Sequence, residues 1–430
     1  MSSNEAQKKI SEYAKFGSRL GLERMGYLME ELNHPEEKLK VIHVAGTNGK
    51  GSVCRYIYET LSSLGYKVGI FSSPYVYDFC ERIEANGKMI NEKELDVLTK
   101  KVLSVADKIV EEKNESPTEF EILTAIGLLY FEEKDLDFVV LEVGLGGKGD
   151  STNIIKNPIL TIITHISLDH MDQLGDTIEK IASEKAGILK ENCPVVISAR
   201  NEASKVIAKR AYELRAPLID STRIKYKIHS QSIEGYSFSA IIDGKRFDNI
   251  EISMVGDHQI ENALCALCAI ENLRTRKYIV LDSEALKEGM KKAVLLSRFQ
   301  IFSKEPLVIF DGAHNASGAK VLADAIKKLL PSKKVLMVVS ILKDKEDMEI
   351  LKELKDIASD FIATASSNER SLLGEELATK IDGNVTVAQT AKDAYEMAMK
   401  VSEKYDVVIF AGSFYMISDI MNYLRGKGKC

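Results

Sequence analysis

Apolar runs of strand length alternate with amphipathic segments over the first half of the chain. The runs occupy residues 41–46, 67–71, 137–143, 159–166 and 194–199. Amphipathic stretches typical of helices lie between them, at residues 50–64, 92–113 and 118–134. Continuous apolar strands joined by helical crossovers indicate a parallel sheet covered by helices on both faces.

Residues 223–255 show a different pattern, in which apolar and polar positions alternate one by one. Turn signals interrupt this segment, EG at 234–235 and DGK at 243–245, so it predicts antiparallel strands or hairpins. Helical patterns follow near 258–273 and 283–293.

A second alternating series follows the segment LLSRFQ at residues 295–300. Its strand-like runs are LVIFDG, KVLMVVSIL, DFIATAS, VTVAQ and DVVIFAGS, with helices expected near 316–330, 345–355 and 391–404. We therefore expect an α/β protein of two domains. Residues 1–296 would form a P-loop-containing, mostly parallel sheet with a small antiparallel section, and residues 297–430 a smaller Rossmann-like domain.

Composition narrows the class of protein. The 430 residues are 45% apolar and 28% charged, as in globular chains, and the net charge of −6 has both signs interspersed. A nucleic-acid binder would instead carry a basic stripe. Apolar runs are too short to span a bilayer and the polar start is no secretory signal, so we expect a cytoplasmic protein without membrane or nucleic-acid partners. Cys265 and Cys268 form one CxxC, which favours small core residues over a metal half-site.

Chemically active side chains follow four strands of the first domain where each strand ends. Carboxyl ends of parallel strands meet at one edge of the sheet, where ligands of such proteins bind. Lysine, hydroxyl, carboxylate and imidazole groups should therefore converge there, although they lie far apart in sequence. They are Lys50, Ser72, Ser73, Glu142, Asp169 and His170.

The stretch VIHVAGTNGKGS, residues 41–52, has the parts of a phosphate-binding loop without the Walker spacing. Val44 stands where that pattern needs its first glycine, and Gly51 separates Lys50 from Ser52. Small residues before a helix N-terminus still suit a phosphate cradle, in which Lys50 would reach the terminal phosphates and Ser52 would coordinate Mg²⁺. The alternative is an ordinary turn from strand to helix.

Glu142 and His170 suit a divalent ion beside phosphates, since Mg²⁺ prefers oxygen ligands and keeps several waters. A histidine is a less usual Mg²⁺ ligand, and His170 alone would more often be structural. The glycine-rich stretch at 142–153 is either part of the site or a flexible loop. Thr118 and Glu121 have the spacing of a capping box that opens a helix, with a substrate contact as an extra role.

Six motifs occur in an order that resembles one family. They are HVAGTNGKGS, SSPYVYDFCERI, EVGLGGKGDSTN, ISLDHMDQLGDTIEKIASEKAGI, GDHQIENALCAL and IFDGAHN. Together they resemble the folylpolyglutamate synthase and dihydrofolate synthase family of the Mur ligase superfamily, from about residue 16 onward. The resemblance implies an ATP-binding central domain at 1–296 and a glutamate-ligase domain at 297–430. It also implies that the shorter loop replaces the Walker spacing.

The family's functional residues carry over to matching positions. Lys50, His170 and Lys185 would be catalytic, and Lys185 is the lysine that the family carbamylates. Mg²⁺, two ions in this family, would be held by Ser52, Ser73, Glu142, His170 and the carbamylated Lys185. ATP would be contacted by Thr47, Asn48, Gly49, Lys50, Gly51, Ser52, Asn262, Arg298, Asp311 and His314.

Two features qualify the resemblance. Lys148 stands where the family usually has arginine, and lysine keeps the charge but loses the planar fork. Only some 40 residues precede the loop, which leaves no room for the nucleotide-sugar-binding domain of cell-wall Mur ligases and favours the folate branch.

The expected function is ATP-dependent addition of L-glutamate to the γ-carboxylate of a folate through an acyl phosphate. Folate and L-glutamate are the expected partners, and we expect a monomer. One alternative is a bifunctional enzyme that also joins dihydropteroate to glutamate. Another is a nucleotide-dependent switch or binding protein without ligase chemistry, against which the second domain with its DGAHN motif argues.

Overall fold

The computed structural model describes residues 3–17, 19–113 and 115–427. The chain divides into two compact units. The first consists of residues 1–229, 237–252 and 259–293, and the second of residues 230–236, 253–258 and 294–430. Each unit contains its own sheet. The domain boundary expected between residues 296 and 297 remains a prediction.

The first unit is built on a sheet that has eight strands among the described residues, in the order β4-β3-β2-β5-β1-β6-β7-β8. Strands β2, β5, β1, β6 and β7 run parallel, as the apolar runs predicted. Strand β8, which no predicted run covered, continues the parallel order, and β3 and β4 extend the sheet antiparallel. The strands are β1 (Val41–Ala45), β2 (Val68–Phe71), β3 (Ile83–Ala85), β4 (Lys88–Met89), β5 (Phe138–Glu142), β6 (Leu160–Ile163), β7 (Val195–Ile197) and β8 (Leu218–Asp220).

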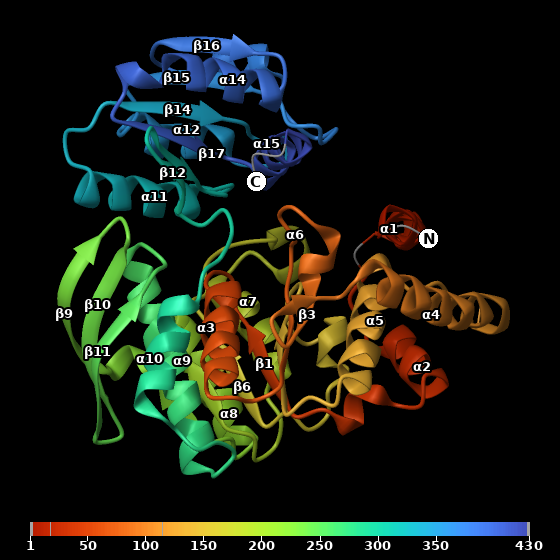
Figure 1. Ribbon diagram of the computed structural model, residues 1–430. Coiled ribbons are helices and arrows are strands. Elements are labelled where there is room, and N and C mark those ends of the chain that lie inside the picture. Colours follow the sequence, from red (N-terminus) through yellow and green to blue (C-terminus); the bar gives the residue numbers. More distant parts are fainter. Residues whose placement is uncertain (1–2, 18, 114, 428–430) are drawn as a thin grey trace. The chain divides into compact units, whose positions relative to one another are not determined.

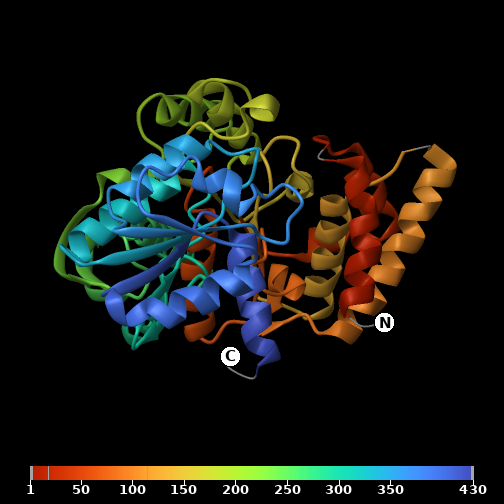
Figure 2. The same cartoon turned by 90° about the horizontal axis from the view of Figure 1, so that it is seen from above.

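Helices cover this sheet in groups (Figure 1). One apolar core joins α1, α2, α4 and α5 to β1, β2, β3 and β5, and another joins α7 and α8 to β1, β6 and β7. Figure 2 shows α1 and α4, red and orange, side by side near the N-terminus. Helix α3 packs against β1, β2, β5 and α10. The helices are α1 (Ser3–Ser11), α2 (Glu23–Glu31), α3 (Lys50–Ser63), α4 (Glu92–Lys113), α5 (Glu119–Glu133), α6 (Met171–Leu174), α7 (Ile178–Lys185), α8 (Asn201–Glu213), α9 (Asp257–Thr275) and α10 (Ser283–Lys292).

The register of the central strands decides where the functional groups lie. Val44 of β1 is paired with Glu142 of β5 on one side and with Ile162 of β6 on the other. The segments that follow these strands therefore leave the sheet at the same edge. The glycine-rich loop after β1 and the segment after β6 are neighbours for this reason.

The segment predicted to be antiparallel forms a three-stranded sheet in the order β11-β10-β9. Its strands are β9 (Lys225–Ser232), β10 (Gly235–Ile242) and β11 (Lys245–Ile252). The two predicted turn signals lie at the two hairpin connections, which confirms the antiparallel strands predicted from the alternating pattern.

The second unit has a sheet of six strands among the described residues, in the order β12-β13-β17-β14-β15-β16, with β12 antiparallel to its neighbour. The strands are β12 (Gln300–Lys304), β13 (Leu307–Phe310), β14 (Val335–Val339), β15 (Asp360–Thr364), β16 (Val385–Ala388) and β17 (Val407–Ala411). The helices are α11 (Ala316–Leu329), α12 (Asp347–Lys355), α13 (Gly374–Ala378), α14 (Ala391–Val401) and α15 (Phe414–Gly426). The α/β fold class predicted from the sequence is confirmed.

Two smaller expectations can also be checked. Cys265 and Cys268 are both buried within α9, which confirms that the CxxC consists of core residues. Of the helices in the described part of the chain, none combines the length and the apolar character needed to cross a bilayer.

Candidate nucleotide and metal site

The loop after β1 turns sharply into α3 because Gly49 adopts a left-handed conformation, with φ of 89°, as the residue before the helix. A Cβ atom on Gly49 would lie 2.4 Å from Oδ1 of Asn262 on α9. Both the backbone angle and this close approach require glycine. Lys50, Gly51 and Ser52 then form the first turn of α3, whose leading N–H groups have no partner within the helix itself.

Thr47 and Asn48 are tied to the segment that follows β6. Their backbone N–H groups both donate to the carbonyl oxygen of His165, at 2.9 and 3.2 Å. The Thr47 hydroxyl also donates to the Ser167 carbonyl at 3.1 Å, and the Asn48 amide donates to the Ser167 hydroxyl at 3.2 Å. These two residues therefore fix the loop to the segment after β6, and the N-terminus of α3 follows directly.

Two lysine side chains meet inside this loop. Lys50 Nζ donates to the carbonyl oxygens of Gly46 at 3.1 Å and Thr47 at 3.2 Å. Lys185 Nζ, from the last turn of α7, donates to the same Gly46 oxygen at 2.8 Å. Lys185 is 5% exposed, and burial, reinforced by the charge of Lys50, lowers the pKa of its amine to about 7.

Lys185 is held in place by the second glycine-rich loop. The backbone of Gly147 packs so closely on α7 that a Cβ atom there would lie 2.8 Å from Cα of Lys185. The N–H group of Lys148 donates to the Glu184 carbonyl at 2.9 Å, and the N–H group of Leu145 donates to Asp150 at 2.8 Å. This loop thus has a defined conformation built against the end of α7, and nothing in the structure explains the lysine side chain at 148.

Ser73 and Glu142 come together at the same edge of the sheet. Glu142 ends β5 and is 3% exposed, and the backbone N–H of Ser73 donates to its Oε2 at 3.3 Å. Ser52 is also buried, and its hydroxyl oxygen accepts a hydrogen bond from Gln259 at 3.2 Å. Two hydroxyls and a carboxylate offer the oxygen ligands that Mg²⁺ prefers.

His170 is more exposed than these residues. It precedes α6 in a left-handed conformation, its side chain is half exposed, and its Nε2 lies 3.8 Å from Oδ2 of Asp169. The negative charge of Asp169 acts on Lys185, whose pKa it raises against the effect of burial. The Asp169 carboxylate, just before α6, therefore acts electrostatically on Lys185.

The second unit brings its predicted residues together as well. Asp311 follows β13 and accepts hydrogen bonds from the N–H groups of Phe299 at 2.7 Å and Ala313 at 2.9 Å. Burial raises the pKa of Asp311 to about 6, although the nearby Arg298 guanidinium acts in the opposite direction.

Phe414, at the start of α15, links the other two residues of this cluster. The Arg298 guanidinium lies 4.9 Å from the centre of the Phe414 ring, and the His314 ring lies 5.4 Å from it. His314 Nδ1 is 2.9 Å from the carbonyl oxygen of Gly312. Arg298, Asp311 and His314 thus form one group within the second unit.

Two buried polar contacts could not be predicted from the sequence. Arg24 Nε donates to Glu121 Oε2 at 3.1 Å, and the N–H of Thr118 donates to the same oxygen at 2.7 Å, so the predicted capping box is present and also carries an arginine. The side chain of Gln259 joins Ser52 to Asn262. Neither contact has a local signal, because the partners lie 97 and 207 residues apart.

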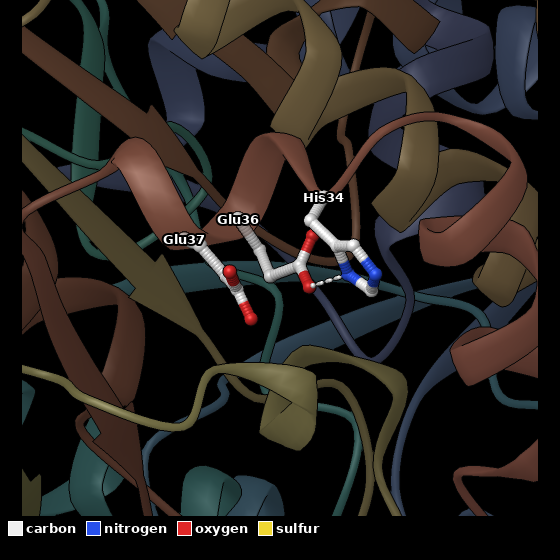
Figure 3. Close-up of side chains that lie close together, drawn as sticks. All are labelled: His34, Glu36 and Glu37. Atoms are coloured by element: carbon white, nitrogen blue, oxygen red, sulfur yellow. Dashed lines mark hydrogen bonds and ion pairs between the residues drawn. The ribbon is translucent and has the colours of Figure 1, made fainter.

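One further group of possible metal ligands lies elsewhere, before β1. Figure 3 shows His34, Glu36 and Glu37, whose ligand atoms all lie within 4.8 Å of one another. His34 Nδ1 lies 3.0 Å from Glu36 Oε1, and Glu37 pairs with Lys156 at 3.1 Å. His34 and Glu36 already contact each other and Glu37 pairs with a lysine, so we assign no metal to this group.

A lysine-bearing glycine loop before a helix N-terminus, at the edge of a parallel sheet, is the arrangement typical of nucleotide-binding α/β proteins. Two families match the chain: the Mur ligase middle domain over residues 44–270 and the Mur ligase, glutamate ligase domain over residues 297–414. The chain belongs to the folylpolyglutamate synthase/dihydrofolate synthase family of the Mur ligase superfamily. It is thus an ATP-dependent glutamate ligase, as the resemblance predicted, and a switch protein without ligase chemistry is not supported.

Individual relatives cover nearly the whole chain. A Bacillus subtilis dihydrofolate synthase/folylpolyglutamate synthase is 37% identical over 98% of this chain and 99% of its own length. The structure is similar to Mycobacterium tuberculosis folylpolyglutamate synthase complexed with ADP, with a TM-score of 0.89, 26% identity and 98% of each chain covered. It is also similar to an Escherichia coli protein described in complex with DHPP and ADP, with a TM-score of 0.86, 31% identity and 98% of each chain covered.

Proposed function

We propose that this enzyme adds L-glutamate to the γ-carboxylate of tetrahydrofolate and its glutamylated forms, with ATP as the source of energy. The observation that supports it most strongly is the meeting of Lys50 and Lys185 on the carbonyl oxygen of Gly46, at the sheet edge where Glu142 ends β5. This places positive charge at a helix N-terminus that is built to receive phosphate.

The reaction needs an activated carboxyl group, because a carboxylate is a poor electrophile and an amine cannot displace its oxygen. A carboxylate oxygen of the folate takes the γ-phosphoryl group from ATP, and ADP leaves. The α-amine of L-glutamate then attacks the acyl carbon of this acyl phosphate, the bond from carbon to the phosphate oxygen breaks, and the amine loses its proton to solvent. The protein contributes positioning and charge stabilisation rather than covalent chemistry.

Lys50 has a defined part in this reaction. Its ammonium group now binds the loop's own carbonyl groups, and a triphosphate at the N-terminus of α3 would draw it away to the β- and γ-phosphates. The remaining ATP contacts are proposed from the family pattern. They are Thr47, Asn48, Gly49, Gly51, Ser52, Asn262, Arg298, Asp311 and His314.

The donor set fits Mg²⁺. Ser52, Ser73 and Glu142 supply oxygen atoms, and we assign His170 to the same ion-binding region with a nitrogen donor. Bound there, Mg²⁺ would neutralise the charge of the phosphates. Lys185 is buried, and its neutral amine can combine with CO₂ to give a carbamate. The carbamate would supply anionic oxygen atoms in place of the amine of Lys185.

A second activity, joining dihydropteroate to L-glutamate, is favoured by the names of the relatives. The Bacillus subtilis protein carries both activities in its name, and the match spans nearly the full length of both chains. The two reactions share the same activation chemistry, so one site can serve both.

A single assay tests both proposals. Phosphate release from ATP is measured with dihydropteroate, tetrahydrofolate or a folate diglutamate, each with and without L-glutamate. We expect release that needs both a pteroyl substrate and glutamate. Equal release without any pteroyl compound would contradict ligase function. No release with dihydropteroate plus L-glutamate, in an enzyme that is active with tetrahydrofolate plus L-glutamate, would contradict the second activity.

A further inference from the structure

Gln259 is a buried polar residue in the first turn of α9 to which the reaction described above gives no role. Only 3% of its surface is exposed. Its Nε2 donates to the hydroxyl oxygen of Ser52 on α3 at 3.2 Å. Its Oε1 accepts from Nδ2 of Asn262 at 3.2 Å. The glutamine amide therefore bridges two residues that we assign to ATP and metal binding, each about as buried as Gln259 itself.

The direction of these hydrogen bonds fixes the Ser52 hydroxyl. A serine oxygen has one proton to donate and two lone pairs. The N–H of Gln259 occupies one lone pair, which leaves the other lone pair for a cation and directs the proton away from Gln259. Because both side chains are buried, water has little access to replace this donor.

The same amide fixes Asn262. With Nδ2 held by Gln259, the Asn262 carbonyl oxygen lies beside Gly49, 2.4 Å from the place a Cβ atom would take. A continuous row of contacts thus runs from Gly49 in the glycine loop through Asn262 and Gln259 to Ser52 in the first turn of α3. The row joins α9 to α3 at the nucleotide site.

We propose that Gln259 is a positioning residue that orients the Ser52 hydroxyl for Mg²⁺ and the phosphates, and couples that orientation to Asn262. The inference rests on the proposed function, since it takes Ser52 as a metal ligand. It predicts that loss of the Gln259 N–H group weakens the contribution of Mg²⁺ to nucleotide binding, whereas an effect that passes through Asn262 changes nucleotide binding equally with and without Mg²⁺.

The test is calorimetric titration of ADP into the full-length enzyme, with and without Mg²⁺. Gln259→Met keeps the length and neutrality of the side chain but has no N–H group, and Gln259→Leu serves as a second variant if the first fails to fold. We expect the factor by which Mg²⁺ tightens ADP binding to fall about tenfold, roughly the loss of one buried hydrogen bond. Gln389→Met is the matched control, because that glutamine is exposed and binds only Glu375 on the second unit's surface.

Ser52→Ala and the double variant complete the experiment. Ser52→Ala should lower the Mg²⁺ effect at least as much, and adding Gln259→Met to it should lower that effect no further, because the glutamine acts on the metal only through the hydroxyl. If Ser52→Ala loses the Mg²⁺ effect while Gln259→Met keeps it, or if the two losses add, the positioning role is wrong. If Ser52→Ala itself keeps the full Mg²⁺ effect, the proposed metal site is wrong and the role of Gln259 falls with it.

Discussion

Lys50 and Lys185 share one acceptor, the carbonyl oxygen of Gly46, at 3.1 and 2.8 Å. Burial, together with the nearby positive charge of Lys50, lowers the pKa of Lys185 to about 7, because a second ammonium group on this oxygen would be repelled by the first. A triphosphate would relieve this strain by taking Lys50. Carbamylation would relieve it by turning Lys185 into an anion.

Lys50→Ala should lose ligase activity by a factor of about a hundred or more, because the charge that it brings matters most where phosphate charge develops. The variant should stay folded, since the helix and the loop keep their glycine turn. Steady-state kinetics and circular dichroism measure the two effects, with the exposed Lys67→Ala as control. Near-normal turnover by a folded Lys50→Ala protein would remove the loop from the mechanism.

Lys185→Ala should be inactive, and added acetate should restore part of the activity by filling the place of the carbamate. Lys180→Ala on the same helix, where the side chain is exposed and pairs with Asp176, is the control and should be fully active. A ¹³C-bicarbonate NMR spectrum should show a carbamate signal in the enzyme and in Lys180→Ala but not in Lys185→Ala. Full activity of Lys185→Ala would rule out a role for the carbamate.

Asp311 should make stability depend on pH. Its pKa is about 6 in the folded protein, above the unfolded value of about 4, so ionisation opposes folding. Its contribution to stability is present in full below about pH 4 and is lost as the pH rises through about 6. Relative to Asp311→Asn, which cannot ionise, the free energy of unfolding should fall by up to about 3 kcal/mol between about pH 4 and pH 7.

Urea unfolding of the enzyme and Asp311→Asn across this pH range measures the difference. The amide disturbs one of the two backbone hydrogen bonds, but that cost is the same at each pH and cancels from the slope. The free energy of unfolding of the enzyme minus that of Asp311→Asn should fall as the pH rises. If this difference stays constant or increases with pH, the raised pKa of Asp311 is contradicted.

Gly147→Ala should destabilise the enzyme by about 1–3 kcal/mol, because a methyl group would push the loop away from α7. The clash is with backbone atoms of Glu184 and Lys185, at 2.7 and 2.8 Å, so activity should fall with stability. Gly26→Ala is the matched control: it lies in helix α2 with open space around it and should stabilise by up to about 1 kcal/mol. Equal behaviour of the two variants would mean that the loop does not position Lys185.

The sequence predicted elements whose pattern is local and missed those defined by partners. Apolar runs such as 137–143 became central strands because burial on both faces needs continuous apolar residues. Strands β3 and β4, with three and two residues, carry too few positions for a period to be visible. Helix α15 is an exception, because its apolar positions follow a helical period and yet no helix was predicted there.

The strand ends and the motifs predicted part of the site. The parallel-sheet rule placed Lys50, Ser73 and Glu142 at one edge, where the structure has them. It could not supply the contact of Gln259 with Ser52 or of Arg24 with Glu121, because those pairs join separate elements through packing that no local spacing encodes. The Gly46 carbonyl oxygen shared by Lys50 and Lys185 could not be predicted for the same reason.

The most direct test of the central claim follows one oxygen atom. A tetrahydrofolate labelled with ¹⁸O in its γ-carboxylate is incubated with the enzyme, ATP and L-glutamate, and the released phosphate is examined by mass spectrometry or ³¹P NMR. Activation through an acyl phosphate transfers one labelled oxygen to each phosphate released with the glutamylated product. Phosphate without label, in a reaction that still forms the product, would contradict it.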